Sequence, residues 1–104
     1  MPFHSSVAVS KSAIEGLAKS IAAEYAPKIR ANVVAPSLTD TPLAGRLLST
    51  DEKRAASDQR HPLKRVGKTE DISNAIYYLL SDDSSWVSGQ VLGVDGGMGS
   101  VKIV

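Results

Sequence analysis

Two short apolar runs, separated by a long stretch with helical patterns, restrict the folds open to this chain. Ala31–Ala35 carries paired valines, and Gln90–Val94 mixes apolar residues with a glycine, so both are predicted strands. Residues with helical periodicity lie between them, and two strands that are joined through helices pair in parallel. The sequence therefore predicts a parallel α/β arrangement with a right-handed crossover.

Helical periodicity predicts one long helix before the first strand and another before the last strand. Pro27 ends the first helix, and Ser5 or Ser6 is expected to cap its start. Thr69, followed by two acidic residues, is expected to cap the last helix. The predicted buried stripes are Ile14, Leu17, Ala18, Ile21, Ala22 and Tyr25 in the first helix, and Ile72, Ala75, Ile76, Leu79 and Leu80 in the last.

The segment between the first strand and the last helix predicts two short helices. Thr41 is a helix cap followed by proline, and the apolar residues up to Leu48 suit a short amphipathic helix. Ser49 and Glu52 have the spacing of a capping box, which predicts a second helix. The stretch from Asp51 to Arg60 is highly charged, so we expect it to be a solvated face.

Two strands are too few to cover these apolar stripes. A parallel strand pair is normally buried on both faces within a larger sheet. We therefore expect this chain either to be part of a larger sheet or to complete its core by association.

Composition excludes several classes of function. The net charge of +1, from 12 basic and 11 acidic residues, argues against binding to nucleic acid or to a membrane surface. No apolar stretch is long enough to span a membrane, and the N-terminus does not resemble a signal peptide. With no cysteine, and with His4 and His61 far apart, we expect no metal site and a cytoplasmic protein.

Three segments in order resemble the C-terminal part of the short-chain dehydrogenase/reductase family. They are Phe3 to Lys11, Ile29 to Pro36, and Gly89 to Gly97. The resemblance implies that residues 1–104 form the C-terminal portion of a doubly wound Rossmann-type sheet, with strands Ala31–Ala35 and Gln90–Val94 and crossover helices. In the family this sheet belongs to a single domain that binds NAD or NADP.

The first of these segments departs from the family at its catalytic residue. The family has Tyr-x-x-x-Lys here, and Lys11 matches the lysine, whereas Val7 stands where the tyrosine is expected. The resemblance implies that Lys11 contacts the nicotinamide ribose. In the family the lysine lowers the pKa of the tyrosine, and Val7 offers no such group. His4 lies three residues earlier and is an alternative acid on the same helical face.

The turn after the first strand resembles the family's Pro-Gly-x-x-x-Thr motif. The resemblance implies that Pro36, Ser37, Leu38, Thr39 and Thr41 line the nicotinamide end of the cofactor, with Ser37 in place of the glycine. The alternative is an ordinary loop in which Thr41 only caps a helix. The glycines Gly93, Gly96, Gly97 and Gly99 have no following helix, so we expect turns with positive φ there and no phosphate site.

Two functions follow from these expectations. The first is the C-terminal segment of an NAD(P)-dependent oxidoreductase that transfers hydride to or from a carbonyl or alcohol, inactive as this chain alone. Neither a Gly-rich phosphate loop nor the family tyrosine occurs in the 104 residues, so we expect no tightly bound cofactor. The alternative is a non-catalytic oligomerisation or interaction module. In both cases we expect a homo-oligomer.

Overall fold

The computed structural model describes residues 4–102 as a small α/β unit. The elements, in chain order, are α1 His4–Glu24, β1 Val33–Pro36, the 3₁₀ helix η1 Pro42–Ala44, α2 Asp51–Arg60, α3 Thr69–Leu80, the 3₁₀ helix η2 Asp82–Ser84 and β2 Val91–Val94.

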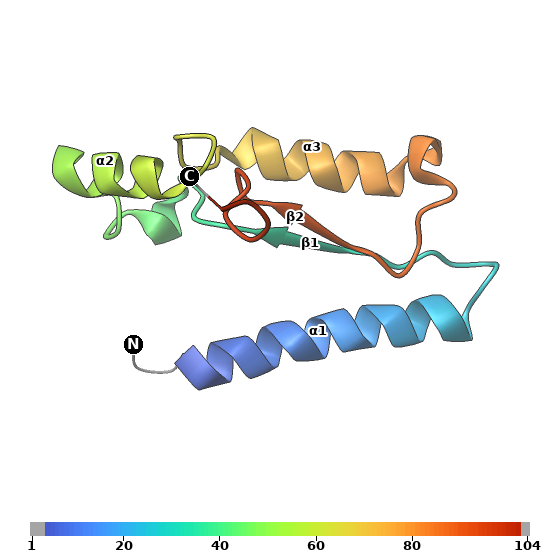
Figure 1. Cartoon of the computed structure of the whole chain (residues 1–104). Helices are drawn as coiled ribbons and strands as arrows, with labels where there is room; N and C mark the ends of the chain where they lie inside the picture. Colours follow the sequence, from blue (N-terminus) through green and yellow to red (C-terminus); the bar gives the residue numbers. More distant parts are fainter. Residues whose placement is uncertain (1–3, 103–104) are drawn as a thin grey trace.

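The two strands pair in parallel, as the sequence predicts. The register places Val33 opposite Val91 and Pro36 opposite Val94. β1 starts at Val33 instead of Ala31 and includes Pro36. Helix α1 lies on one face of the strand pair and α3 on the other (Figure 1). The predicted fold class, part of a doubly wound α/β sheet, is therefore confirmed.

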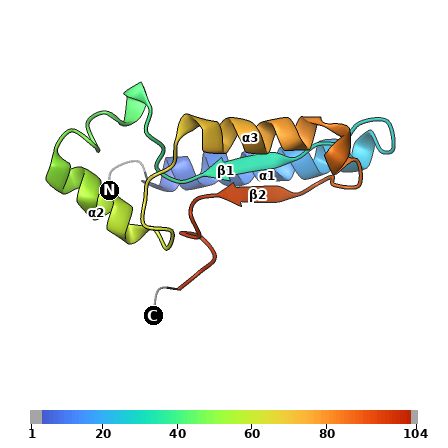
Figure 2. The ribbon, with the colours of Figure 1, turned by 90° about the horizontal axis from the view of Figure 1, so that it is seen from above.

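The connection from β1 through α3 to β2 is left-handed, so the prediction of a right-handed crossover was wrong. Figure 1 shows α3 on the face opposite α1, and Figure 2 shows β2 displaced to one side of β1. A right-handed connection to β2 would place α3 on the face that α1 covers.

Several predicted helix ends shift by one residue or more. Helix α1 already contains Ser5 and Ser6, so neither is its cap. Helix α2 is capped by Thr50, whose Oγ1 accepts a hydrogen bond from the Lys53 amide, and not by Ser49. The cap position of α3 is Lys68, one residue before Thr69.

The first predicted short helix is mostly absent. Thr41 does cap it, and its Oγ1 accepts a hydrogen bond from the amide of Ala44, but only the 3₁₀ turn η1 forms. The apolar side chains of this segment divide between core and solvent. Ala44 and Leu48 are buried, whereas Leu43 and Leu47 are exposed.

The hydrophobic core is small and contains no residue of the long helices α1 and α3. It contains Ala44, Leu48 and Val66, with Leu38 packed against it. The stripes predicted to be buried are largely open to solvent, with Ile14 56% and Leu17 60% exposed on α1 and Leu80 79% exposed on α3. The prediction that this chain cannot cover its own apolar faces is therefore confirmed.

Candidate functional site

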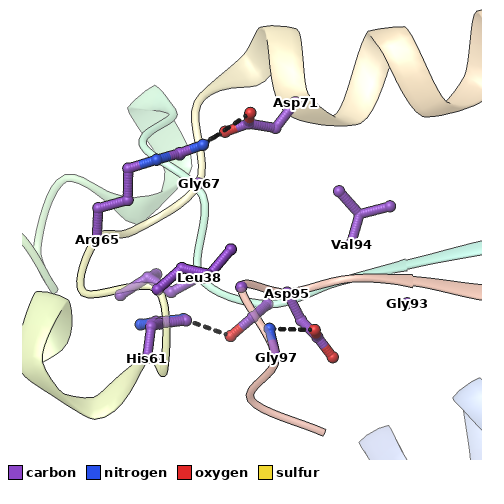
Figure 3. Close-up of a pocket in the computed structure, with 12 residues that line it drawn as sticks. Leu38, His61, Arg65, Gly67, Asp71, Gly93, Val94, Asp95 and Gly97 are labelled. Carbon is purple, nitrogen blue, oxygen red and sulfur yellow. Dashed lines mark hydrogen bonds and ion pairs between the residues drawn. The ribbon is translucent and has the colours of Figure 1, made fainter. Parts of the chain in front are cut away.

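A cavity of about 320 Å³ lies beyond the carboxyl ends of β1 and β2. Figure 3 shows that its walls come from three parts of the chain. Ser37 and Leu38 follow β1, Gly93 to Gly97 end β2, and the loop before α3 supplies the third wall. Ligands of open α/β sheets bind at this end of the strands. His61, Leu63, Arg65 and Gly67 of that loop line the cavity, together with Asp71 in the first turn of α3.

The best-defined polar group in this cavity is His61, which entered the sequence analysis only in the argument against a metal site. His61 directly follows α2 and is 2% exposed. Its Nδ1 lies 2.7 Å from the carbonyl oxygen of Ser57, and its Nε2 lies 2.9 Å from Oγ of Ser37. A carbonyl only accepts, so Nδ1 carries a proton, and in the neutral ring Ser37 donates to Nε2. The imidazole thus joins the end of α2 to the turn after β1.

The turn after β1 is held by the backbone of Gly67. The Gly67 amide donates to the Leu38 carbonyl at 2.9 Å, and the Asp40 amide donates to the Gly67 carbonyl at 2.8 Å. Oγ1 of Thr39 donates to the carbonyl of Ser37 at 3.0 Å. A Cβ added at Gly67 would lie 3.1 Å from that Oγ1, which is tighter than ordinary contact. A side chain at this position would require the Thr39 hydroxyl to shift by a few tenths of an ångström.

The structure brings only part of the predicted cofactor residues together. Ser37 and Leu38 line the cavity, whereas Lys11 and Thr41 do not. Lys11 is exposed on α1, and the Thr41 hydroxyl caps η1. Pro36 ends β1, and Thr39 bonds back into its own turn. The predicted contacts of these residues with a cofactor remain predictions, and the side chain of His4 lies outside the described residues.

The glycine-rich end of β2 forms a tight turn around Asp95. Gly96 and Gly97 have φ of 61° and 88°, which confirms the predicted positive φ at these two positions. The Asp95 carboxylate accepts hydrogen bonds from the amides of Gly97 and Gly99 at 2.9 and 3.1 Å. Gly93 and Gly99 do not have positive φ, so the same prediction was wrong for them. Their side-chain space is instead occupied by the Asp95 carboxylate.

The charged pair of Arg65 and Asp71 forms one wall of the cavity (Figure 3). The two guanidinium nitrogens of Arg65 donate to the two carboxylate oxygens at 2.7 and 3.1 Å. Asp71 also accepts a hydrogen bond from the Lys68 amide at 2.7 Å, at the start of α3. These bonds, first that from Arg65 and then that from Lys68, lower the pKa of Asp71 to about 2.

Asp71→Asn is expected to destabilise the fold at neutral pH and to have no effect in strong acid. The folded pKa of about 2 lies below the value of about 3.9 for an unfolded aspartate. The carboxylate therefore contributes stability above about pH 4, and this contribution is lost as the pH falls towards 2. Urea denaturation between pH 2 and pH 7 measures the difference, with exposed Asp83→Asn as the control. An equal difference at all pH values would contradict this assignment.

Residues 4–102 contain neither a group of metal ligands nor a helix suited to span a membrane. No three carboxylates or imidazoles in that range are placed to hold a metal ion. None of the helices described there combines the length and the apolar character of a membrane span.

Comparison with known proteins identifies close relatives. The family model described as Enoyl-(Acyl carrier protein) reductase matches residues 1–99. The 3-oxoacyl-[acyl-carrier-protein] reductase FabG of Thermotoga maritima is 41% identical over 98 residues, which cover 93% of this chain and 39% of that protein. The chain thus spans about two fifths of the length of this curated relative.

Solved structures show the same fold. The aldohexose dehydrogenase of Thermoplasma acidophilum has a TM-score of 0.83 at 36% identity, over 92% of this chain and 41% of its own. A gluconate 5-dehydrogenase from Burkholderia cenocepacia, solved with NADP and tartrate, has a TM-score of 0.82 at 33% identity, over 91% of this chain and 38% of its own.

Proposed function

This chain belongs to the short-chain dehydrogenase/reductase family, and we propose that it supplies part of the nicotinamide side of an NAD(P)-dependent oxidoreductase site. The reaction class is hydride transfer to or from a carbonyl or alcohol. The observation that carries the proposal is the turn after β1, which lies at the carboxyl ends of the strands and is held rigidly by Gly67. The solved relative with bound NADP supports the class of cofactor.

The turn has free backbone groups that suit a carboxamide. Within residues 4–102, the amides of Leu38 and Thr39 donate no hydrogen bond, whereas the neighbouring amides of Ser37 and Asp40 both donate. A nicotinamide carboxamide presents one acceptor and two donors, so it fits an unpaired amide beside a carbonyl. When bound, the cofactor supplies the hydride, and these backbone groups would orient its ring. Lys11, as the family resemblance implies, would contact its ribose.

We expect this chain alone to bind the cofactor weakly and to contact only its nicotinamide end. The sequence contains no Gly-rich phosphate loop, and at the start of α3, in the cavity wall, the Lys68 amide already donates to the Asp71 carboxylate. Calorimetry with NAD or NADP should therefore show no micromolar dissociation constant, which corresponds to about −8 kcal/mol. Nicotinamide mononucleotide at millimolar concentration should shift the backbone NMR signals of Leu38 and Thr39.

Lys11→Ala should weaken those shifts, and Lys28→Ala, at an exposed lysine beyond α1, should not. Shifts confined to other parts of the chain, or none at millimolar ligand, would contradict the proposal.

The second candidate is a non-catalytic oligomerisation module, which the exposed apolar stripe of α1 favours. Tyr25 is 49% exposed in addition to Ile14 and Leu17. Burying about 400 Å² of apolar surface on each of two subunits contributes on the order of 20 kcal/mol before association entropy is subtracted. We therefore expect a homo-oligomer by sedimentation at low micromolar concentration. Ile21→Asp should reduce the oligomer and the helical signal together, and a compact folded monomer of the parent chain would refute the expectation.

A further inference from the structure

Another cavity, of about 400 Å³, lies between α2 and the segment that precedes this helix. Lys53, Ser57 and Arg60 form its wall on α2, because residues three or four apart are neighbours on one helix face. The volume is within the range of small-molecule sites, roughly 300–1,000 Å³. The residues that line this cavity are Arg46, Leu47, Lys53, Ala56, Ser57 and Arg60.

Three cations line this cavity, and no carboxylate does. The chain as a whole has 12 basic and 11 acidic residues, so this lining differs from the overall composition. The nearby acids are placed elsewhere. Asp58 accepts a hydrogen bond from a backbone amide of the core, Asp40 pairs with Arg54, and Asp51 and Glu52 lie outside the lining in the first turn of α2. The cavity therefore has a concentrated positive potential, which favours an anionic ligand.

The three cations keep hydrogen-bond donors that the chain does not use. None of them forms an ion pair within residues 4–102, and the guanidinium of Arg46 donates to no group in that range. Arg60 donates through Nη2 alone, to Oγ of Ser57 at 3.2 Å. Nζ of Lys53 makes two long contacts, of 3.4 and 3.5 Å. Most of the N–H groups of these side chains are thus available to a ligand.

The one buried polar side chain in the lining is that of Ser57. This residue is 4% exposed. Its Oγ accepts the hydrogen bond from Arg60, but its hydroxyl donates to no acceptor in the part of the chain that the structure describes. Buried polar groups normally use their hydrogen-bonding capacity. An acceptor oxygen of a ligand in the cavity would complete the bonding of this hydroxyl.

We propose that Arg46, Lys53, Ser57 and Arg60 bind the phosphate monoester of a small-molecule ligand. A phosphate monoester carries a charge of about −1.5 to −2 at neutral pH. A carboxylate carries a single charge and would leave two of the three cations without a counter-charge. Guanidinium groups match phosphate oxygens with paired hydrogen bonds, and the Ser57 hydroxyl donates to a further oxygen. The site is separate from the cavity at the strand ends, so its occupation does not depend on the proposed cofactor site.

Titration of the 104-residue chain with inorganic phosphate, followed by backbone NMR, tests the proposal. We expect saturable shifts centred on Lys53, Ser57 and Arg60, which sodium chloride at equal ionic strength does not produce. Arg60→Gln should weaken phosphate binding by about tenfold or more. Arg54→Gln is the matched control, because it removes the same charge from the same helix, but Arg54 is paired with Asp40 and does not line the cavity. Equal effects of the two substitutions would overturn the proposal.

Ser57→Ala separates hydrogen bonding from net charge, because it removes the hydroxyl and leaves every charge in place. We expect an unchanged circular dichroism spectrum and a loss of phosphate affinity of about threefold or more. Phosphoethanolamine should bind at the same residues, and ethanolamine should not. The proposal is overturned if the chain shows no saturable phosphate binding, if Ser57→Ala keeps full affinity, or if phosphoethanolamine does not bind.

Discussion

Replacing Arg30 by methionine is expected to destabilise the fold by about 3 kcal/mol, enough to abolish cooperative unfolding in a chain with so small a core. Nη1 of Arg30 donates to the carbonyls of Ser84 and Val87 at 2.9 and 3.1 Å and to the Ser84 hydroxyl at 3.1 Å. Nη2 donates to the carbonyls of Leu79 and Ser81 at 3.2 and 3.3 Å. A single guanidinium thus donates to four carbonyls and one hydroxyl in the segment that runs from the end of α3 through η2.

The size of this effect follows from what the substitution leaves behind. Methionine matches the apolar stem of arginine but donates nothing, so five hydrogen bonds from a charged donor are lost, although each of the four carbonyls keeps another donor. Hydrogen bonds to charged groups contribute about 1.5–3 kcal/mol each, and the remaining donors keep the total well below the sum of the five. Chemical denaturation followed by circular dichroism measures the change. Arg46→Met is the control, because Arg46 is an exposed arginine. A loss for Arg30→Met no larger than that for Arg46→Met would show that the cluster around Ser84 is not important for stability.

The purified chain alone is expected to show no reduction of simple ketones or acetoacetyl thioesters by NADPH. A positioned general acid contributes about 10²–10⁴ in rate, and Val7, at the family's tyrosine position, has no proton to donate. The Gly-rich loop that anchors the pyrophosphate is also absent from the 104 residues, which removes the positioning of the cofactor.

Absorbance at the nicotinamide band measures the oxidation of NADPH, with the Thermotoga maritima reductase as the active reference. The predicted inactivity would be disproved by steady oxidation of NADPH if Lys11→Ala abolishes this oxidation and Lys28→Ala leaves it unchanged. Such a result would also indicate that another group replaces the tyrosine.

The sequence alone predicted the element order and the family for clear physical reasons. Paired β-branched residues in Ala31–Ala35 and helical stripes in the flanking segments are local signals, and they identified β1 and α1 to within a few residues. The positive φ at Gly96 and Gly97 was predicted because a glycine-rich turn without a following helix has few other conformations. The count of strands against helices also predicted that this chain cannot cover its apolar stripes, although Leu17 itself was predicted to be buried and is exposed.

The tertiary structure alone decided the features that depend on residues far apart in the chain. His61 appeared unremarkable in sequence because its partner Ser37 lies 24 positions earlier, and only the packing of α2 against the turn brings them together. Arg30 reaches Ser84 across 54 positions. The crossover from β1 to β2 departs from the general right-handed rule, since α3 lies on the face opposite α1, and no local pattern in the sequence indicated this. Periodicity and propensity report the local chain, whereas these contacts arise from which faces remain free once the neighbouring elements have packed.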